Sequence, residues 1–101
     1  MKVCYIAGKY RAKTPRGIVE NIRAAEAVAL KYWKQGHAVI CPHMNSALFD
    51  GALPDEVWMD GDLAILERCH TIVMMQGWQE SDGARREHEM ALGLRLEIIY
   101  D

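Results

Sequence analysis

The segment Met75-Gln-Gly-Trp-Gln-Glu-Ser-Asp-Gly-Ala-Arg-Arg-Glu87 decides how the chain folds. It begins at the end of the apolar run Thr71–Met75, which is typical of a buried strand, and it leads into Ala84–Arg95, which we expect to be a helix. Between the two, Ser81 and Gly83 are typical of turns and helix N-caps. A strand, a glycine-containing loop and a helix N-terminus together make a common site for a phosphate or carboxylate.

Glu87 is the residue of this segment that most suggests chemistry. The predicted helix has apolar positions at Met90, Ala91 and Leu94, and counting back from them by three or four residues reaches Glu87. We therefore predict that Glu87 faces the protein from the first turn, where free N–H groups and the helix dipole favour an anion. The alternative is an acidic residue that only stabilises its helix, by about 0.3–1 kcal/mol.

Two further helices are expected upstream. Thr14 can cap the first, with Pro15 at its first position and Gly36 as its stop. Asp55–Cys69 is the second, with a possible interruption at Asp60-Gly61. The apolar side of the first helix is expected at Ile18, Ile22, Ala25, Ala29 and Trp33, and that of the second at Trp58, Asp62, Ile65, Leu66 and Cys69. Asp62 is thus a second carboxylate on an inward face.

Three more short apolar runs, Lys2–Ala7, Ala38–Cys41 and Leu96–Tyr100, complete an alternation of strands and helices. Asn45–Pro54 is expected to be irregular. Right-handed crossovers turn this order into a small doubly wound, Rossmann- or flavodoxin-like α/β fold with helices on both faces. We expect one domain over residues 1–101, with a four-stranded parallel sheet in the order 2-1-3-4 and a switch point between the first and third strands.

Ligands bind such sheets outside the carboxyl ends of the strands. Those ends would bring together Gly8–Arg11, His43–Asn45 and Gln76–Gly83. Glu87 can reach the same crevice, and Asp62 can reach it if its helix begins there. Two carboxyl groups at one crevice are candidates for a nucleophile and a general acid, a pair that glycosyl transfer commonly uses. The alternative is two helix-start acids of ordinary pKa.

The other candidate residues would bind a ligand. Ser81 and Gly83 could hold a phosphate through hydroxyl and N–H groups, and Arg11 could pair with the same anion. Plain capping and a solvated arginine are the alternatives. His43 is expected to form a hydrogen bond in the pocket and not to bind a metal, because Cys41 and His37 do not complete a recognised ligand set.

Composition excludes several classes of protein. The net charge of −2 does not indicate a surface for nucleic acid polymers. No stretch reaches the ~20 apolar residues of a membrane span, and the N-terminus lacks the apolar region of a signal peptide. The 3 cysteines, Cys4, Cys41 and Cys69, have no metal-type spacing. We interpret them as reduced, buried thiols of a cytoplasmic protein.

Four segments together resemble the nucleoside 2-deoxyribosyltransferase superfamily. Within it, the pattern is similar to small bacterial and phage domains of uncharacterised function and to the 2′-deoxynucleoside 5′-monophosphate N-hydrolases. The segments lie in the right order over nearly the whole chain: Tyr5-Ile-Ala-Gly8-Lys-Tyr-Arg11, Val39-Ile-Cys-Pro-His43, Asp62-Leu-Ala-Ile-Leu and Ser81-Asp-Gly-Ala-Arg-Arg-Glu87.

The resemblance implies a role for each matching residue. Glu87 would be the nucleophile that forms a covalent glycosyl-enzyme, and Asp62 would assist proton transfer and orient the sugar. Ser81 would bind a 5′-phosphate, and Tyr5, Arg11 and His43 would line the pocket. Their positions at the strand ends and at the helix start add Gly8, Tyr10 and Gly83 to the expected substrate-binding residues. Tyr5 and Tyr10 could contact the base or sugar, although Tyr5 fits a core position equally well. No metal or organic cofactor is implied. Members are typically homodimers or larger homo-oligomers, with a neighbouring subunit completing the pocket.

The chain departs from the pattern at three places. Arg85 replaces a small residue between the serine and the glutamate, the Gln76–Glu80 loop is slightly extended, and the chain ends just after the fourth strand. Three hypotheses follow. The first is an N-glycosidase or deoxyribosyltransferase acting on a nucleoside or nucleotide. The second is a non-catalytic module that binds or senses a nucleotide. The third is a structural domain whose two acids only cap helices.

Overall fold

Four short apolar segments pair in parallel into one sheet, β1 (Val3–Ala7), β2 (Ala38–Ile40), β3 (Thr71–Met74) and β4 (Glu97–Tyr100). The computed structural model describes all residues, 1–101. The strand order is β2-β1-β3-β4, and Tyr5 of β1 lies opposite Ile40 on one side and Ile72 on the other. The predicted α/β class and the 2-1-3-4 order are therefore confirmed.

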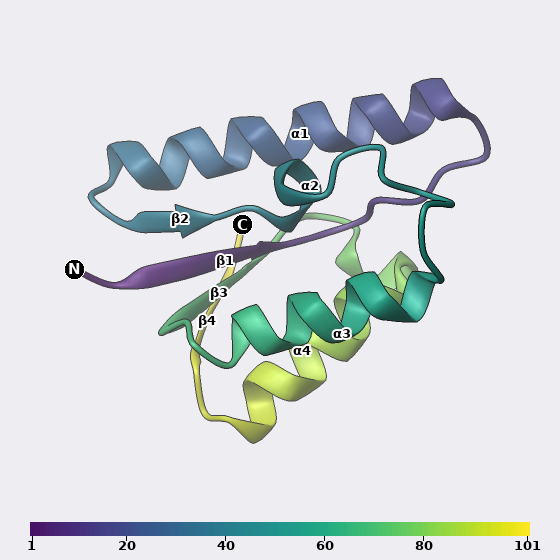
Figure 1. The fold of residues 1–101 in the computed structure, drawn as a ribbon. Coiled ribbons are helices and arrows are strands. Elements are labelled where there is room, and N and C mark those ends of the chain that lie inside the picture. The colour runs from purple at the N-terminus through teal and green to yellow at the C-terminus, as the bar shows by residue number, and fades with distance from the viewer.

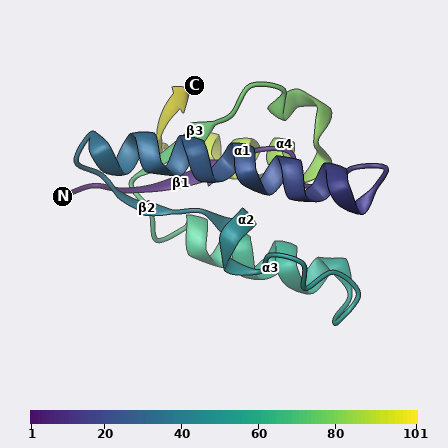
Figure 2. The ribbon, with the colours of Figure 1, turned by 90° about the horizontal axis from the view of Figure 1, so that it is seen from above.

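Helices cover both faces of this sheet (Figure 1). The long helix α1 (Pro15–Lys34) lies on one face, and α3 (Asp55–Leu66) and α4 (Asp82–Gly93) lie on the other, which the view from above also shows (Figure 2). Two short elements were not expected from the sequence, the helix α2 (Pro42–Asn45) and the 3₁₀ turn η1 (Trp78–Glu80).

Side chains alternate along the central strands and form a separate core on each face. Tyr5 and Ala7 of β1 pack with Ile72 and Met74 of β3 beneath α3 and α4. The intervening residues Cys4, Ile6 and Val73, together with Met75 just after β3, pack beneath α1. This is the alternation that a sheet buried on both sides requires. It places Tyr5 on the face that carries α4.

The expected inward face of α1 is wrong at its last position. Tyr32 is buried there, whereas Trp33 is 53% exposed. Both positions continue a spacing of three or four residues from Ala29, so the apolar pattern alone does not separate them. The Tyr32 hydroxyl donates a hydrogen bond to Asp101 at 3.0 Å, which holds this ring against the end of the sheet.

The boundaries of the other two long helices also differ from expectation. α4 begins at Asp82, two residues before the predicted start, so Glu87 lies in the second turn and not the first. The helix ends at Gly93, and Leu94 is 45% exposed instead of facing inward. α3 runs without a break through Asp60-Gly61 and ends at Leu66.

Helices α1 and α4 end with the same hydrogen-bond pattern. In α1, His37 N–H donates to Tyr32 C=O and Gly36 N–H to Trp33 C=O. In α4, Leu96 N–H donates to Ala91 C=O and Arg95 N–H to Leu92 C=O. This is the Schellman motif, which needs a left-handed residue just after the helix. Gly36, the predicted stop of α1, has φ +92° there, and Arg95 has φ +58°.

All three cysteines are free thiols, with Cys4 and Cys69 buried and Cys41 only half-buried. None of the helices combines the length and the apolar character that crossing a bilayer requires.

Candidate active site

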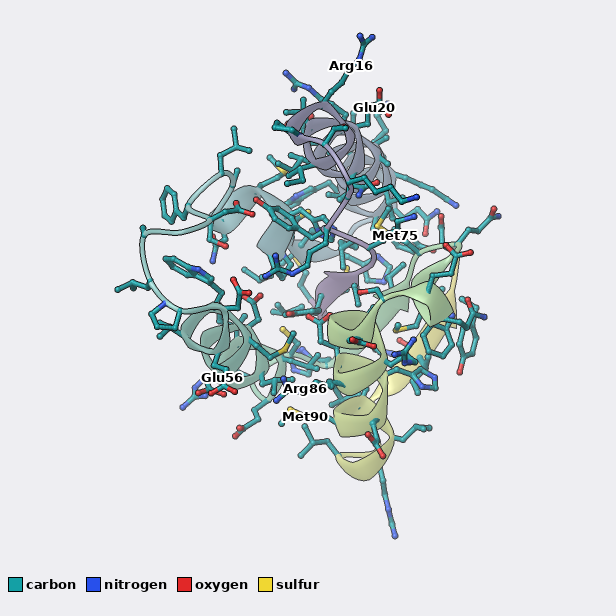
Figure 3. All side chains as sticks on the ribbon, turned by 90° about the vertical axis from the view of Figure 1, so that its right-hand side faces the viewer. Arg16, Glu20, Glu56, Met75, Arg86 and Met90 are labelled. Atoms are coloured by element: carbon teal, nitrogen blue, oxygen red, sulfur yellow. The ribbon has the colours of Figure 1, made fainter.

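A cavity of about 450 Å³ opens at the carboxyl ends of the strands. Its walls come from the segment after β1, from α2 and the loop that follows it, from α3, and from the start of α4. Figure 3 views the molecule from this side, with Glu56 of α3 and Arg86 of α4 on opposite walls. The cavity therefore lies where a doubly wound sheet is expected to bind ligands.

Glu87 lines this cavity from α4 although only 6% of its surface is exposed. The hydroxyl of Tyr5, which is fully buried in β1, donates a hydrogen bond to Glu87 Oε2. The pKa of Glu87 is raised to about 8, mainly by burial and in smaller part by the negative charge of Asp62, while the Tyr5 hydrogen bond opposes the rise. Tyr5 is thus both a core residue and the partner of the carboxyl group, instead of lining the cavity as expected.

Asp62 lines the same cavity from the facing helix α3. Desolvation by burial raises the pKa of this carboxyl to about 6. Its charge also raises the pKa values of Glu87 and of Tyr5, so the three groups are electrostatically coupled. Two interacting carboxyl groups with separated pKa values can share one proton near neutral pH, which is the arrangement that acid–base chemistry needs.

His43 is 5% exposed at the start of α2 and lines the cavity. Its Nε2 lies 3.0 Å from Lys9 C=O. Because a carbonyl oxygen only accepts, Nε2 carries the proton and Nδ1 is an acceptor. Desolvation lowers the pKa of the ring, which favours this neutral form. Nδ1 is buried and has no hydrogen-bond partner. The expected role of His43 as a pocket residue agrees with this position.

Three consecutive residues after β1 connect the walls of the cavity. Lys9 Nζ lies 3.6 Å from the Glu80 carboxylate in η1, and Arg11 forms an ion pair of 2.6 Å with Asp55 of α3. Between them, the Tyr10 hydroxyl donates to Asp50 at 2.6 Å. Arg11 was expected to face an anionic ligand, but its guanidinium is already paired with a carboxylate.

The N-terminus of α4 forms the fourth wall. Ser81 is the N-cap, and its hydroxyl accepts a hydrogen bond from Ala84 N–H at 3.2 Å. Ser81 and Gly83 both line the cavity. A Cβ atom at Gly83 would come within 2.8 Å of Met59 Cε, which is the end of a flexible side chain and can move aside. Capping and ligand binding are both compatible with this geometry.

Gly8 lines the cavity at the end of β1. A Cβ atom there would lie 2.6 Å from Met75 Sδ, so the absence of a side chain lets β1 pass close to the end of β3. The nine residues expected at the site are therefore brought together, with Tyr5 lying beneath the cavity surface and the other eight lining it.

Sequence reasoning missed several residues of the walls. Arg86 lines the cavity, whereas Arg85 does not and is paired instead with Asp82 and with Gln79 C=O. Trp58, expected only as an apolar helix position, also lines the cavity, and its indole Nε1 is buried without a partner. No local pattern in the sequence indicates that Arg86 lines the cavity. Trp58 lies four residues before Asp62, on the same helix face, and that spacing could have identified it.

Trp78, in the central segment, does not line the cavity. Its ring packs on His88, with centroids 4.2 Å apart, and lies 6.3 Å from Tyr100. No group of three or more His, Cys, Asp or Glu side chains is arranged to hold a metal ion.

A family profile described as Domain of unknown function (DUF4406) matches residues 1–100, which is nearly the entire chain. The chain belongs to this family. A comparison with curated proteins finds no match. The family description states no activity, so the functional argument depends on the cavity itself.

Proposed function

We propose that this DUF4406 domain cleaves the N-glycosidic bond of a nucleoside or nucleoside 5′-monophosphate, with Glu87 as nucleophile. The observation that carries the proposal is the pairing of Glu87 with Asp62 across one cavity from two helices, each with a raised pKa. Residues that match the nucleoside 2-deoxyribosyltransferase pattern lie around this pair, which supports the choice of a glycosidic bond.

The reaction would proceed by double displacement. A Glu87 carboxylate oxygen attacks the anomeric carbon, the bond to the base breaks, and its electron pair leaves with the base nitrogen, which takes a proton from Asp62. Water or a second base then attacks the glycosyl ester and gives its proton to Asp62. The sugar leaves and the Glu87 carboxylate is regenerated. The Tyr5 hydroxyl stabilises the ionised form of Glu87 through its hydrogen bond.

The 5′ end of the substrate would lie at the start of α4. Ser81 and the N-terminal N–H groups of the helix are suited to a phosphate, and Arg86 is the cation of the walls that has no ion-pair partner. Several carboxylates also line the cavity, which favours an uncharged sugar hydroxyl. We therefore propose both nucleosides and 5′-monophosphates as substrates to be compared directly.

Non-catalytic nucleotide binding is the second candidate function. It is favoured by the pKa of Glu87 near 8, which leaves most of this carboxyl protonated at neutral pH in the unliganded protein. Such a module would use the same cavity to sense or sequester a nucleotide without breaking it.

One assay separates the candidates. The protein is incubated with a panel of nucleosides and 5′-monophosphates, and free base is measured by chromatography. Glycosidase activity releases base, and Glu87→Gln abolishes the release while the protein stays folded. Binding alone gives no free base, but a nucleotide raises the melting temperature. If neither effect occurs with any member of the panel, the cavity has no role in nucleotide chemistry and the proposal fails.

We further propose that the chain forms a homodimer or a larger homo-oligomer. The resemblance implies this assembly, and the segment between α2 and α3 offers a surface for it. Exposed apolar side chains on and near that segment lie beside the cavity: Met44, Leu48, Phe49, Leu53 and Val57.

A further inference from the structure

Negative charge is concentrated in the walls of the cavity. Seven of the residues that line it are Asp or Glu, and three are Lys or Arg. The formal charge of the walls is therefore −4, whereas that of the whole chain is −2. His43 adds no positive charge, because desolvation lowers the pKa of its ring and favours the neutral form. Walls of this charge repel an anionic ligand and attract a cationic one.

The cations of the walls are mostly neutralised within the fold. Lys9 and Arg11 are paired with carboxylates of the neighbouring walls, and Arg86 is the one cation left without a partner. On the acidic side, Asp82 is paired with Arg85. The acids of the walls that have no cationic partner are Asp50, Glu56, Asp62 and Glu87. The space for a ligand is therefore bordered by a surplus of carboxyl groups that the fold itself does not neutralise.

Glu87 is the acid of this set that is most deeply buried and still open to the cavity. Only 6% of its surface is exposed, and its Oε2 accepts the hydrogen bond from Tyr5. The other oxygen, Oε1, makes no hydrogen bond within the chain and stays accessible from the cavity. A positive charge on a ligand beside Oε1 would favour the ionised form of this carboxyl.

Aromatic side chains lie among these carboxyl groups. Tyr10 and Trp58 line the cavity, and the ring of Phe49 lies 5.8 Å from that of Trp58. Aromatic faces stack on planar rings and attract cations through the charge distribution of the ring. Carboxylates together with aromatic faces suit a flat ring that carries a positive charge.

We propose that the preferred substrates of this site are N-glycosides whose base carries a positive charge at neutral pH, such as a pyridinium ring or an N-alkylated purinium ring. This inference rests on the proposed function and narrows its substrate class. The two kinds of ring share the charge and the planarity that the walls recognise, and they differ in size, so the experiment includes one of each.

A cationic base also changes how the glycosidic bond breaks. A Glu87 carboxylate oxygen attacks the anomeric carbon, and the electron pair of the broken bond neutralises the positive charge of the base, which leaves without taking a proton. Asp62 can therefore be ionised during this step, as its pKa of about 6 favours at neutral pH. Water then attacks the glycosyl ester and gives its proton to Asp62, which passes it to the solvent.

Binding is measured first, in the Glu87→Gln protein, which prevents turnover. 1-(β-D-Ribofuranosyl)pyridinium-3-carboxamide is compared with its uncharged 1,4-dihydro form, and 1-methyladenosine, a cation at pH 7, with its neutral isomer N6-methyladenosine. Each pair is tested as riboside and as 2′-deoxyriboside. Calorimetry at low ionic strength should show the cation of a pair binding about tenfold more tightly, and added salt should reduce the difference.

One variant with a matched control assigns this preference to the cavity. Glu56→Gln removes an unpaired acid of the walls that lies outside the proposed catalytic pair. It should weaken binding of the cations about threefold and leave binding of their neutral partners unchanged. Glu89→Gln removes an exposed acid of α4 that does not line the cavity, and it should change neither. Melting temperatures verify that both variants are folded.

The chemistry is tested in Asp62→Asn with Glu87 intact. Departure of a cationic base needs no acid, whereas attack of water on the ester needs the Asp62 carboxylate. Rapid mixing should therefore give a burst of about one equivalent of free base per chain from the cationic nucleosides. The neutral nucleosides should release none. Adding Glu87→Gln to this variant should remove the burst.

The outcomes separate this inference from the proposed function. If neutral nucleosides are cleaved and cations bind no better than their neutral partners, the charge preference is wrong and the glycosidase proposal stands. Glu89→Gln weakening cation binding as much as Glu56→Gln does would trace the attraction to the chain as a whole, which overturns the inference. So would tight binding of cations without a burst in Asp62→Asn. If no nucleoside is bound or cleaved, both proposals are wrong.

Discussion

The hydrogen bond from Tyr5 to Glu87 joins the middle of β1 to the second turn of α4. It is the contact through which the sheet controls the protonation of the proposed nucleophile. Because this bond lowers the pKa of Glu87 while burial raises it, removing the hydroxyl leaves the burial effect unopposed.

Tyr5→Phe should therefore raise the pKa of Glu87 above about 8, which moves the alkaline limb of the activity profile to higher pH. It should also lower the rate at neutral pH, because less of the protein then carries Glu87 in its ionised, nucleophilic form. We expect base release at pH 7 to fall about tenfold, and stability to fall by about 1 kcal/mol because one buried hydrogen bond is lost. Rates measured from pH 5 to 10, together with urea unfolding, check both effects. An unchanged pH profile would show that the hydroxyl does not control Glu87.

Glu87 should also make the stability of the protein depend on pH. Its folded-state pKa of about 8 is above the unfolded value of 4.5, so folding favours the protonated carboxyl. This contribution is fully present below about pH 4.5 and is lost as the pH rises through about 8. Glu87→Gln removes the dependence. We expect the variant to melt about 5 °C above the parent protein at pH 9 and close to it at pH 5.

Glu89 provides the control for this measurement, because it is an exposed acid on the same helix. Glu89→Gln should leave the dependence of the melting temperature on pH unchanged. A Glu87→Gln protein that loses stability at high pH as fast as the parent would contradict the predicted direction of the shift.

The sequence predicts the two carboxyl groups and the residues that surround them, but not the contacts that those residues make. Glu87 and Asp62 fall on helical stripes, and a local pattern is enough to find them. The expected first-turn position of Glu87 was wrong because helix ends are poorly marked in sequence. The ion pairs of Lys9 and Arg11 join residues far apart in the chain, so no local pattern indicates them.

Helices α1 and α4 both end in a Schellman motif, but a different residue occupies the left-handed position in each. Gly36 occupies the left-handed position after α1 without steric cost, whereas Arg95 occupies the equivalent position after α4 with a Cβ atom that crowds the backbone. Arg95 is exposed and does not line the cavity, so the position can be changed without touching the proposed active site.

Arg95→Gly should stabilise the protein by about 1 kcal/mol, because it relieves the left-handed strain while the two C-terminal hydrogen bonds stay in place. Gly36→Ala should do the opposite by a similar amount. Thermal unfolding at one pH measures both, and base release should be unchanged in Arg95→Gly. Equal melting temperatures for all three proteins would show that the motif does not limit stability.

The pairing of α3 with α4 leads to a prediction about pH and activity. Asp62 on one helix and Glu87 on the other titrate as a coupled pair, with pKa values of about 6 and about 8. The active form holds one proton, so kcat/KM should follow a bell with its plateau between these values. Asp62→Asn should remove one limb of the bell. A profile that rises steadily from pH 5 to 10 would exclude a shared proton.

The sequence predicts which strands and long helices exist more accurately than it predicts where they begin and end. Each strand is an apolar run bounded by turn residues, and all four were found. α2 and η1 were missed because elements of 4 and 3 residues carry too little periodicity to detect. Tyr32 replaces Trp33 on the buried side because a contact with Asp101, at the opposite end of the chain, holds it there.

The whole molecule has a four-stranded sheet with both edges uncovered by further strands, and apolar side chains exposed beside the cavity. The order of the strands was predictable because right-handed crossovers allow few arrangements. The state of assembly has no local signal in the sequence, because it depends on a second copy of the chain, and only the family resemblance predicts it.

We expect sedimentation to give a homodimer or a larger homo-oligomer, with at least twice the 11.5 kDa mass of one chain. Leu53→Glu places a charge among the exposed apolar residues before α3, and it should weaken the dimer about tenfold or more. Leu30→Glu, at an exposed leucine on the opposite face, is the control and should leave the mass unchanged. A parent protein that sediments as a monomer at all concentrations would contradict the proposal.

The alternation of side chains along β1 has a consequence for how this chain can be altered. Tyr5 supplies the hydroxyl for Glu87, while its neighbours Cys4 and Ile6 fill the core under α1. Inserting one residue before Cys4 would exchange the two faces, placing the phenol under α1 and the Cys4 thiol opposite the carboxyl. The alternation of side chains along β1 therefore fixes both the packing of the core and the hydrogen bond to Glu87, and a shift of one residue would disrupt both.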